Sequence, residues 1–233
     1  MSDTTEVLVE RVGSRADVVL NRPERKNAIV ASLAEQLRDT IDVLGRDPSV
    51  HCLLLRGAGG AFCSGIDLKT ASGDLRAGPI PAWSQVHAAL YRSPVPVVVA
   101  LERYAINAGA ALALAADVVV AGEGSFLQVG EIAMGVPAPM CQAWLHLRHS
   151  RAVGDRITLL GDRIPAAELL RLGLVSEVVD DVRVVERAEE LADRIAAHPA
   201  AGRQGIADVW RRLRGTLDDP DAWFASLMNG AAT

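Results

Sequence analysis

Two short segments combine small residues with positions where a backbone N–H could bind an anion. The first, GAFCSGIDLK (60–69), places Gly65 after the apolar run HCLLLRG (51–57), which is typical of a buried strand. The second, NAGA (107–110), begins an alanine-rich apolar segment that is typical of a buried helix. N–H groups in the first turn of a helix have no partner inside the helix and lie at the positive end of its dipole, so they bind oxyanions where side chains are small. Gly65 and Ala108 meet that condition, although glycine turns also follow strands in many proteins that lack such a site.

The elements that would position these turns alternate between strand and helix. Runs rich in Val and Leu predict strands, at 6–12, 16–20, 51–57, 94–101 and 116–122. Apolar spacing predicts helices, at 33–45, 105–116 and 182–198. Ser32 is the predicted N-cap of the first helix and Gly45 its predicted end, while the Gly- and Pro-containing segment 71–83 is predicted to be a mobile loop. Because helical patterns dominate after about residue 140, the chain is predicted to be an α/β protein with a helical C-terminal region.

The composition restricts the classes of partner. The chain has 233 residues, 50% of them apolar, and a net charge of −5, so we expect one main domain with a sizeable core. The acidic balance and the lack of a long basic run argue against nucleic acid or an acidic membrane surface as the main partner. Cys52, Cys63 and Cys141 are widely spaced, so neither a disulfide framework nor a zinc site is predicted, and Cys63 is expected to be a core or pocket residue. The sequence shows no signal-peptide pattern or membrane-length apolar run, and a soluble cytoplasmic protein is expected.

Five segments, in order, resemble the enoyl-CoA hydratase/isomerase family, also called the crotonase family. They are NRPERKNA (21–28), GAFCSGIDLK (60–69), YAINAGAALALAAD (104–117), GEIAMGVP (130–137) and AAELLRLGLVSEVV (166–179). The resemblance implies a ClpP/crotonase-like spiral of ββα units over residues 1–180, which would hold the active site. It also implies that residues 181–233 form a helical trimerisation region, shorter than usual, in a homotrimer or dimer of trimers. The implied substrate is an acyl-coenzyme A thioester, with coenzyme A as part of the substrate, no other tightly bound cofactor and no metal.

The resemblance assigns roles to individual residues. The backbone N–H groups of Ile66 and Ala108 would form an oxyanion hole, which stabilises the enolate that forms when a proton leaves the carbon next to the thioester. The residues that would bind coenzyme A are Arg25, Lys26 and Ala28 at its phosphate and pantetheine parts, and Asp67, Leu68 and Lys69 at its adenine end, with Ser64 and Gly65 beside them. A merely solvated loop is the alternative for Arg25 and Lys26.

Glu131, in the segment EIAMG, is the predicted acid/base group. Hydratases of the family use this glutamate and a second one on the buried helix, where this chain has Ala111, whose methyl group cannot accept a proton. Isomerases of the family keep only the first, because one group can move a proton between two carbons. Burial beside Ile132 and Met134 is expected to raise the pKa of Glu131. We therefore favour Δ3-Δ2-enoyl-CoA isomerisation in fatty-acid metabolism; a structural carboxylate in an ion pair is the alternative for Glu131.

Two residue pairs before the buried helix depart from the family. Glu102 and Arg103 stand where Asn-Gly is usual, and the alternatives are that they pair with each other, contact a neighbouring subunit or reshape the acyl pocket. Asn107 and Ala108 replace Gly-Gly, which narrows the approach to the second amide if Ala108 keeps a negative φ and blocks it otherwise.

More than one interpretation is open for the C-terminal side chains and for the reaction. Trp223 and Phe224 either cap the acyl tunnel or are exposed at a trimer contact, and Arg211, Arg212 and Arg214 are loose candidates for phosphate binding. The rivals to isomerisation are enoyl-CoA hydration or another enolate reaction, such as decarboxylation or thioester hydrolysis. A catalytically silent acyl-CoA binding protein is the rival from outside the enzymes.

Overall fold

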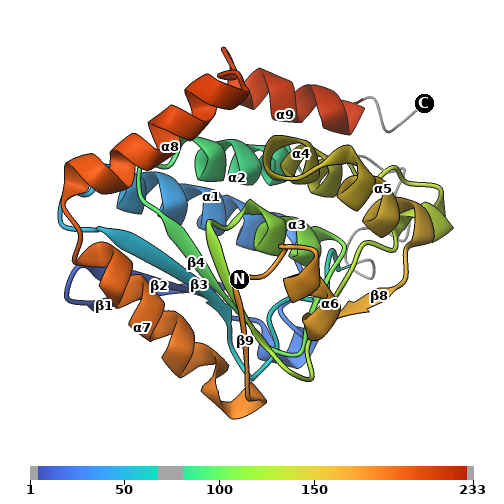
Figure 1. Cartoon of the computed structure of the whole chain (residues 1–233), viewed down its shortest axis with the longest axis horizontal. Helices are drawn as coiled ribbons and strands as arrows, with labels where there is room; N and C mark the ends of the chain where they lie inside the picture. Colours follow the sequence, from blue (N-terminus) through green and yellow to red (C-terminus); the bar gives the residue numbers. More distant parts are fainter. Residues whose placement is uncertain (1–4, 68–80, 230–233) are drawn as a thin grey trace.

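A six-stranded sheet runs through the middle of the protein, with helices on both of its faces (Figure 1). The computed structural model describes residues 5–67 and 81–229. The strands, in the order in which they lie side by side, are β1 (Val7–Val12), β2 (Arg15–Leu20), β3 (Cys52–Gly57), β4 (Val97–Leu101), β6 (Val118–Gly122) and β9 (Glu177–Val179). All neighbours pair in parallel except β1 and β2, which are antiparallel. β4 is buried along its whole length, as expected for a Val-rich strand that is covered on both faces.

The helices divide between the two faces of this sheet. They are α1 (Ala31–Arg46), α2 (Pro81–Arg92), α3 (Ala108–Ala115), α4 (Pro139–Arg148), α5 (Arg151–Leu160), α6 (Ala166–Arg171), α7 (Val184–Ala196), α8 (Ala200–Arg214) and α9 (Pro220–Asn229). α1, α2, α3 and α4 contribute to the main core on one face, and α9 packs on α2 and α4. α7 covers the other face, where Val184, Ala188 and Leu191 pack against residues of β3, β4 and β6. The predicted helical C-terminal region is confirmed, and its role in trimerisation stays a prediction.

A second, smaller sheet positions the candidate site. It contains β5 (Tyr104–Ile106), β7 (Phe126–Gln128) and β8 (Arg163–Pro165). Isolated bridges between Cys63 and Ala105 and between Ile29 and Ile66 extend it. The long strands β3, β4 and β6 are each followed by a short extended segment in the second sheet and then by a helix, which is the ββα repetition that the family resemblance implies. The repetition brings the segment around Gly65 against the start of α3.

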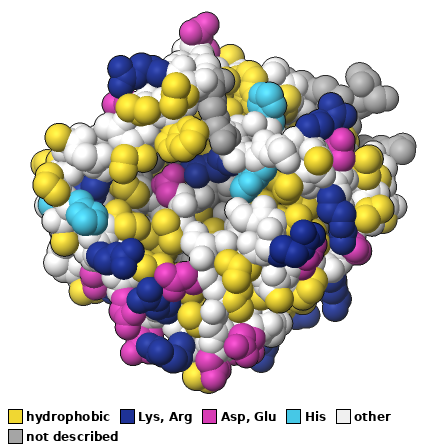
Figure 2. Space-filling view, in the orientation of Figure 1, with side chains coloured by type: hydrophobic (Ala, Val, Ile, Leu, Met, Phe, Trp, Pro, Cys, Tyr) yellow, Lys and Arg dark blue, Asp and Glu magenta, His cyan; other side chains and the backbone are white. Residues whose placement is uncertain are grey.

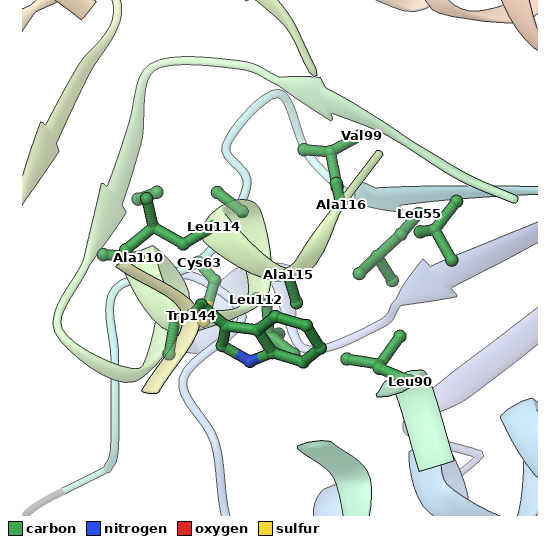
Figure 3. Packing of buried hydrophobic residues seen from close by; sticks show 14 of the residues in the cluster. Leu55, Cys63, Leu90, Val99, Ala110, Leu112, Leu114, Ala115, Ala116 and Trp144 are labelled. Carbon is green, nitrogen blue, oxygen red and sulfur yellow. The ribbon is translucent and has the colours of Figure 1, made fainter. Parts of the chain in front are cut away.

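α3 lies at the centre of the core, with all eight of its residues buried. Figure 3 shows Trp144 of α4 and Leu90 of α2 beside it. A Cβ on Gly109 would lie 2.5 Å from the carbonyl oxygen of Cys63, so this helix packs directly on the backbone of the 60–66 segment. Cys63 is completely buried, and burial raises the pKa of its thiol to about 12. This confirms that Cys63 is a core residue.

The predicted strands and helices are present, but several of their ends differ. The N-cap of α1 is Val30, and the Ser32 hydroxyl, predicted to be the cap, instead donates to the Glu6 carboxylate. α1 also continues through Gly45 to Arg46. The helix predicted from residue 105 begins at Ala108, because the three residues before Asn107 pair with β7.

The predicted mobile loop at 71–83 lies mostly outside the described residues. Its last part is wrong, because Trp83 belongs to α2 and is only 2% exposed. Within the residues that the structure describes, no helix is both long and apolar enough to cross a membrane.

Candidate active site

Gly65 lies directly beside the backbone amide of Ala108. A Cβ built on Gly65 would be 3.8 Å from the Ala108 nitrogen and 2.9 Å from the Ile106 carbonyl oxygen. Its φ of +97° also favours glycine, because L side chains rarely adopt this conformation. Glycine is therefore needed both for the turn and for the close approach of the two segments that the sequence predicts to hold an oxyanion.

The amides of Ile66 and Ala108 have no acceptor among the described residues. Ile29 N donates to Gly65 O at 2.8 Å and Asp67 N donates to Ile29 O at 2.8 Å, so this pairing leaves out the N–H of Ile66. Ala108 is the first residue of α3, so its N–H has no acceptor inside the helix. The positive φ of this turn falls on Asn107 and not on Ala108. With a negative φ at Ala108, the sequence predicts that a ligand oxygen has a narrowed approach to the Ala108 amide but is not blocked from it. Both amides are available to a ligand oxygen.

Glu131 begins the 3₁₀ turn η2 (Glu131–Met134), which follows β7 and Gly130. Its Oε2 atom is buried and has no hydrogen-bond partner within the described residues. Burial raises the pKa of this carboxyl to about 7, and a bond from its own backbone amide only partly offsets the rise. A carboxyl group with a pKa near neutrality suits general acid/base catalysis.

The surroundings of Glu131 differ in part from the prediction. Ile132 and Met134, expected to bury the carboxyl, are themselves 43% and 42% exposed, because η2 turns them outward. Cys141 of α4 is close enough for the Glu131 charge to add to burial in raising the pKa of its thiol. Among the described residues Glu131 forms no ion pair, which argues against the structural alternative for this glutamate.

Two positions, Ala111 and Glu102, bear on whether a second carboxylate accompanies Glu131. Ala111 is in the middle of α3 and fully buried, and its methyl side chain offers no proton acceptor at this position. Glu102 lies between β4 and β5, and burial raises the pKa of its carboxyl. The part of the chain that the structure describes contains no ion pair between Glu102 and the exposed Arg103, so the predicted pairing of these two is not found. Their other two alternatives stay predictions.

Asp67 joins the predicted coenzyme A residues through ion pairs. Its carboxylate accepts from Arg25 at 3.2 Å and from Arg22 at 3.4 Å, and it is 6% exposed. Arg22 is a site residue that the sequence reasoning missed, although it stands in the same NRPERKNA segment. Part of the Arg25 charge is therefore neutralised inside the protein.

The remaining predicted coenzyme A residues lie around this ion pair or outside the described ranges. Lys26 is exposed at φ 55°, and its carbonyl oxygen accepts from Ser64 N at 3.1 Å. Ala28 is buried. Leu68 and Lys69 lie outside the described residues. The structure thus brings the 21–28 segment together with residues 64–67, while coenzyme A binding by these residues stays a prediction.

Two cavities in the described part of the protein lie away from these amides. One of about 850 Å³ is at the C-terminal end of α3, opposite the Ala108 end, with Leu114, Asp117 and Arg148 among its lining residues. Its mouth is the hollow near the middle of the face in Figure 2. The other, of about 600 Å³, lies between α4, α5 and α9. Neither is lined by the predicted catalytic residues. The described residues contain no group of three or more His, Cys, Asp or Glu side chains suited to a metal ion.

The positions of the C-terminal side chains test part of the predictions made for Trp223, Phe224 and Arg211. Phe224 is completely buried, with its ring 5.6 Å from that of Trp144, so the idea that it is exposed at a subunit contact is wrong. Trp223 lines the smaller cavity. Arg211 donates to the carbonyl oxygen of Tyr91 at 2.7 Å and pairs with Asp208, so its guanidinium is already engaged.

Comparisons with known proteins agree with this architecture. The family model described as Enoyl-CoA hydratase/isomerase matches residues 10–219. The 1,2-epoxyphenylacetyl-CoA isomerase of Escherichia coli (strain K12) is 33% identical over 196 residues, which cover 79% of this chain and 74% of that protein. The enoyl-CoA hydratase EchA19 of Mycobacterium tuberculosis is 32% identical over 224 residues, covering 93% of this chain and 83% of that protein.

Solved structures match nearly the whole chain at somewhat lower sequence identity. An enoyl-CoA hydratase/isomerase from Mycobacterium paratuberculosis superposes with a TM-score of 0.85 at 27% identity, covering 100% of this chain and 96% of that one. A carnitinyl-CoA dehydratase from Mycobacterium avium 104 gives a TM-score of 0.84 at 28% identity, covering 98% and 91%. The crotonase-like α/β fold that the motifs imply is therefore confirmed.

Proposed function

The chain belongs to the enoyl-CoA hydratase/isomerase family, and we propose that it converts 3-enoyl-coenzyme A thioesters to 2-enoyl thioesters with Glu131 as its single acid/base group. One observation carries the proposal. Glu131 has a buried carboxylate oxygen with no partner among the described residues, while Ala111 occupies the position of a second glutamate. One proton-transferring group suffices for isomerisation, whereas adding water requires a second group to orient it.

The reaction follows from these groups. The Glu131 carboxylate takes the proton from C2 as the C2–H bond breaks, and the electron pair spreads over the thioester carbonyl and the C3–C4 double bond. The N–H groups of Ile66 and Ala108 bind the carbonyl oxygen as its negative charge grows, and loss of one such donor typically raises the barrier by about 3 kcal/mol. The protonated Glu131 then returns the proton to C4, so that the double bond lies between C2 and C3 and the carboxylate is regenerated.

The remainder of the substrate would lie along the coenzyme A residues. In this proposal Lys26, exposed on its turn, and Arg25, held by Asp67, contact the phosphates, while Leu68 and Lys69 belong to the adenine end. The assembly we propose is a homotrimer or a dimer of trimers, which light scattering on the purified protein would identify from its mass.

Hydration of 2-enoyl thioesters is the second candidate function. The observation that favours it is that EchA19, similar over most of this chain, is a hydratase by name. In that case Glu131 would act on water together with a group that is not Ala111.

Purified protein mixed separately with 3-enoyl-CoA and 2-enoyl-CoA distinguishes these reactions. Isomerisation predicts that only the 3-enoyl substrate yields the conjugated 2-enoyl absorbance, and that Glu131→Gln lowers this rate by at least about a thousandfold. Glu123→Gln, a change at an exposed glutamate, is the matched control and should keep the wild-type rate. Formation of 3-hydroxyacyl-CoA from the 2-enoyl substrate would establish hydration instead. A thermal shift with both thioesters and turnover of neither would indicate a silent binding protein.

A further inference from the structure

Asn107 adopts a backbone conformation that asparagine rarely takes. Its φ of 52° and ψ of −111° place it in a region that glycine enters easily and that a Cβ disfavours. Strain of this kind persists only where the surrounding structure compensates for it, and it is frequent at functional sites. The side chain of Asn107 therefore needs an explanation, because glycine would form the same turn without strain.

The hydrogen bonds of Asn107 supply that explanation. Its side-chain Oδ1 accepts from the backbone N–H of Gly130 at 2.8 Å. Its own N–H donates to Gln128 O at 2.8 Å, and its carbonyl oxygen accepts from Ala111 N at 3.0 Å. Asn107 thus precedes the Ala108 amide along the chain and binds the residue that precedes Glu131.

We propose that Asn107 is a positioning residue that fixes the carboxylate of Glu131 relative to the oxyanion-binding amide of Ala108. The inference rests on the proposed function for the roles of those two groups. It goes beyond that function because it assigns to a third residue, which is neither the proposed base nor a proposed oxyanion donor, the task of holding the two together.

The surroundings of Gly130 show what this bond adds to the position of η2. On the far side, the Gln128 side chain donates to Gly161 O at 3.0 Å, and a Cβ on Gly161 would meet the Ile132 side chain at 2.9 Å, so α5 supports the turn there. Among the described side chains, that of Asn107 provides the hydrogen bond between this turn and the start of α3. Without it, η2 keeps its link to α5 and β7 but loses its side-chain link to the oxyanion turn.

Two substitutions separate a positioning role from a merely structural one. Asn107→Gly removes the bond to Gly130 but permits the same backbone turn, so the loss of the bond and the relief of strain should leave the unfolding temperature within a few degrees of wild type. We expect kcat on 3-enoyl-CoA to fall by about tenfold or more with KM changed less than about twofold, because the base is misplaced while thioester binding persists. Asn107→Asp keeps an oxygen that can accept from Gly130 N, so it preserves the position of η2.

Titration of Glu131 by carbon NMR gives a readout that requires no turnover. The signal is assigned by its loss in Glu131→Gln. In Asn107→Gly the released carboxyl becomes hydrated, and its pKa should fall from about 7 toward the 4.5 of a solvated glutamate. In Asn107→Asp the added negative charge should raise it further. A structural role alone predicts a lower unfolding temperature and the wild-type titration in Asn107→Gly.

The matched control is Asp181→Ala. Asp181 Oδ1 accepts from Gly124 N at 2.9 Å, so it binds a glycine amide at the opposite end of β7 from Gly130. This variant should keep both the wild-type kcat and the wild-type Glu131 titration. Unchanged titration and kcat in Asn107→Gly would overturn the inference. If the wild-type protein turns over no 3-enoyl-CoA but the two Asn107 variants move the titration in opposite directions, the proposed function fails and the positioning role stands.

Discussion

The carbonyl oxygen of Ile106 lies 2.9 Å from the position that a Cβ on Gly65 would occupy. Gly65→Ala must therefore push the 64–66 segment away from β5, and it also strains a backbone at φ +97°. Because Ile66 follows directly, its N–H should leave the oxyanion position. We expect kcat on 3-enoyl-CoA to fall by about a hundredfold, the typical effect of losing one oxyanion donor. Steady-state kinetics on the purified variant measures this loss.

Gly13→Ala is the matched control for that substitution. Gly13 also has a positive φ, of 57°, but nothing lies within 4 Å of a Cβ placed there. It should lose about 1 kcal/mol of unfolding free energy from the left-handed conformation alone, with no change in kcat. Equal kinetic losses in the two variants would show that general destabilisation, and not displacement of Ile66, reduces activity.

The pKa of Glu131, raised by burial to about 7, predicts the pH dependence of turnover. The base is the carboxylate form, so kcat/KM should fall about tenfold per unit as the pH drops below that value and should level off above it. A rate that is flat through neutrality down to about pH 5 would contradict the role of Glu131 as the base.

The raised pKa of Glu131 should also make stability depend on pH, in the opposite direction to activity. Since the folded state holds the Glu131 proton more tightly than the unfolded state, the contribution of this group to stability is present below about pH 4.5 and is lost as the pH rises through about 7. Glu131→Gln should therefore unfold at higher denaturant concentration than wild type above neutral pH, while it is inactive. Urea unfolding at acidic and at slightly alkaline pH measures this difference.

The turn at Gly65 and the helix start at Ala108 could be placed from the sequence because they depend on local chain geometry, whereas Glu131 was singled out only by the resemblance to the family. A glycine after a strand and a helix start keep their relation to the backbone whatever packs around them. The apolar composition of α3 likewise predicted its burial, since a helix without a polar face has no surface to offer water.

Contacts between distant elements could not be predicted in this way. Periodicity indicates which face of a helix is buried but not which element covers it, so the hydrogen bond between His87 of α2 and Trp144 of α4 had no signal in the sequence. The exposure of Ile132 depends on the direction in which η2 leaves β7. The ion pairs of Asp67 depend on the approach of the 21–28 segment, which only the folded chain supplies.

Arg103 occupies a left-handed turn, with φ 54°, between β4 and β5. Its side chain is exposed, so its replacement removes no buried contact. Arg103→Gly should raise the unfolding free energy by about 1 kcal/mol, because glycine adopts this conformation without steric cost. Urea unfolding at neutral pH measures the gain. A loss of stability would show that the Arg103 side chain makes an interaction that outweighs the strain. Glu35→Gly, at an exposed position of α1, should show the opposite, destabilising sign.

The buried His87 should make the folded protein less stable as the pH falls. The side chain is completely buried, its Nδ1 accepts from Trp144 Nε1 at 2.8 Å, and burial lowers its pKa to about 3. In the unfolded chain a histidine has a pKa of about 6.5, so below that pH the unfolded state binds a proton that the folded state refuses. The unfolding free energy should consequently fall by up to about 1.4 kcal/mol for each pH unit below 6.5 through this residue alone.

His87→Asn keeps an oxygen near the position of Nδ1 and does not titrate, so the stability of this variant should depend less steeply on pH between about 6.5 and 4.5. His146→Asn, at an exposed histidine, should keep the wild-type slope. Equal slopes in wild type and His87→Asn would show that His87 becomes protonated in the folded protein.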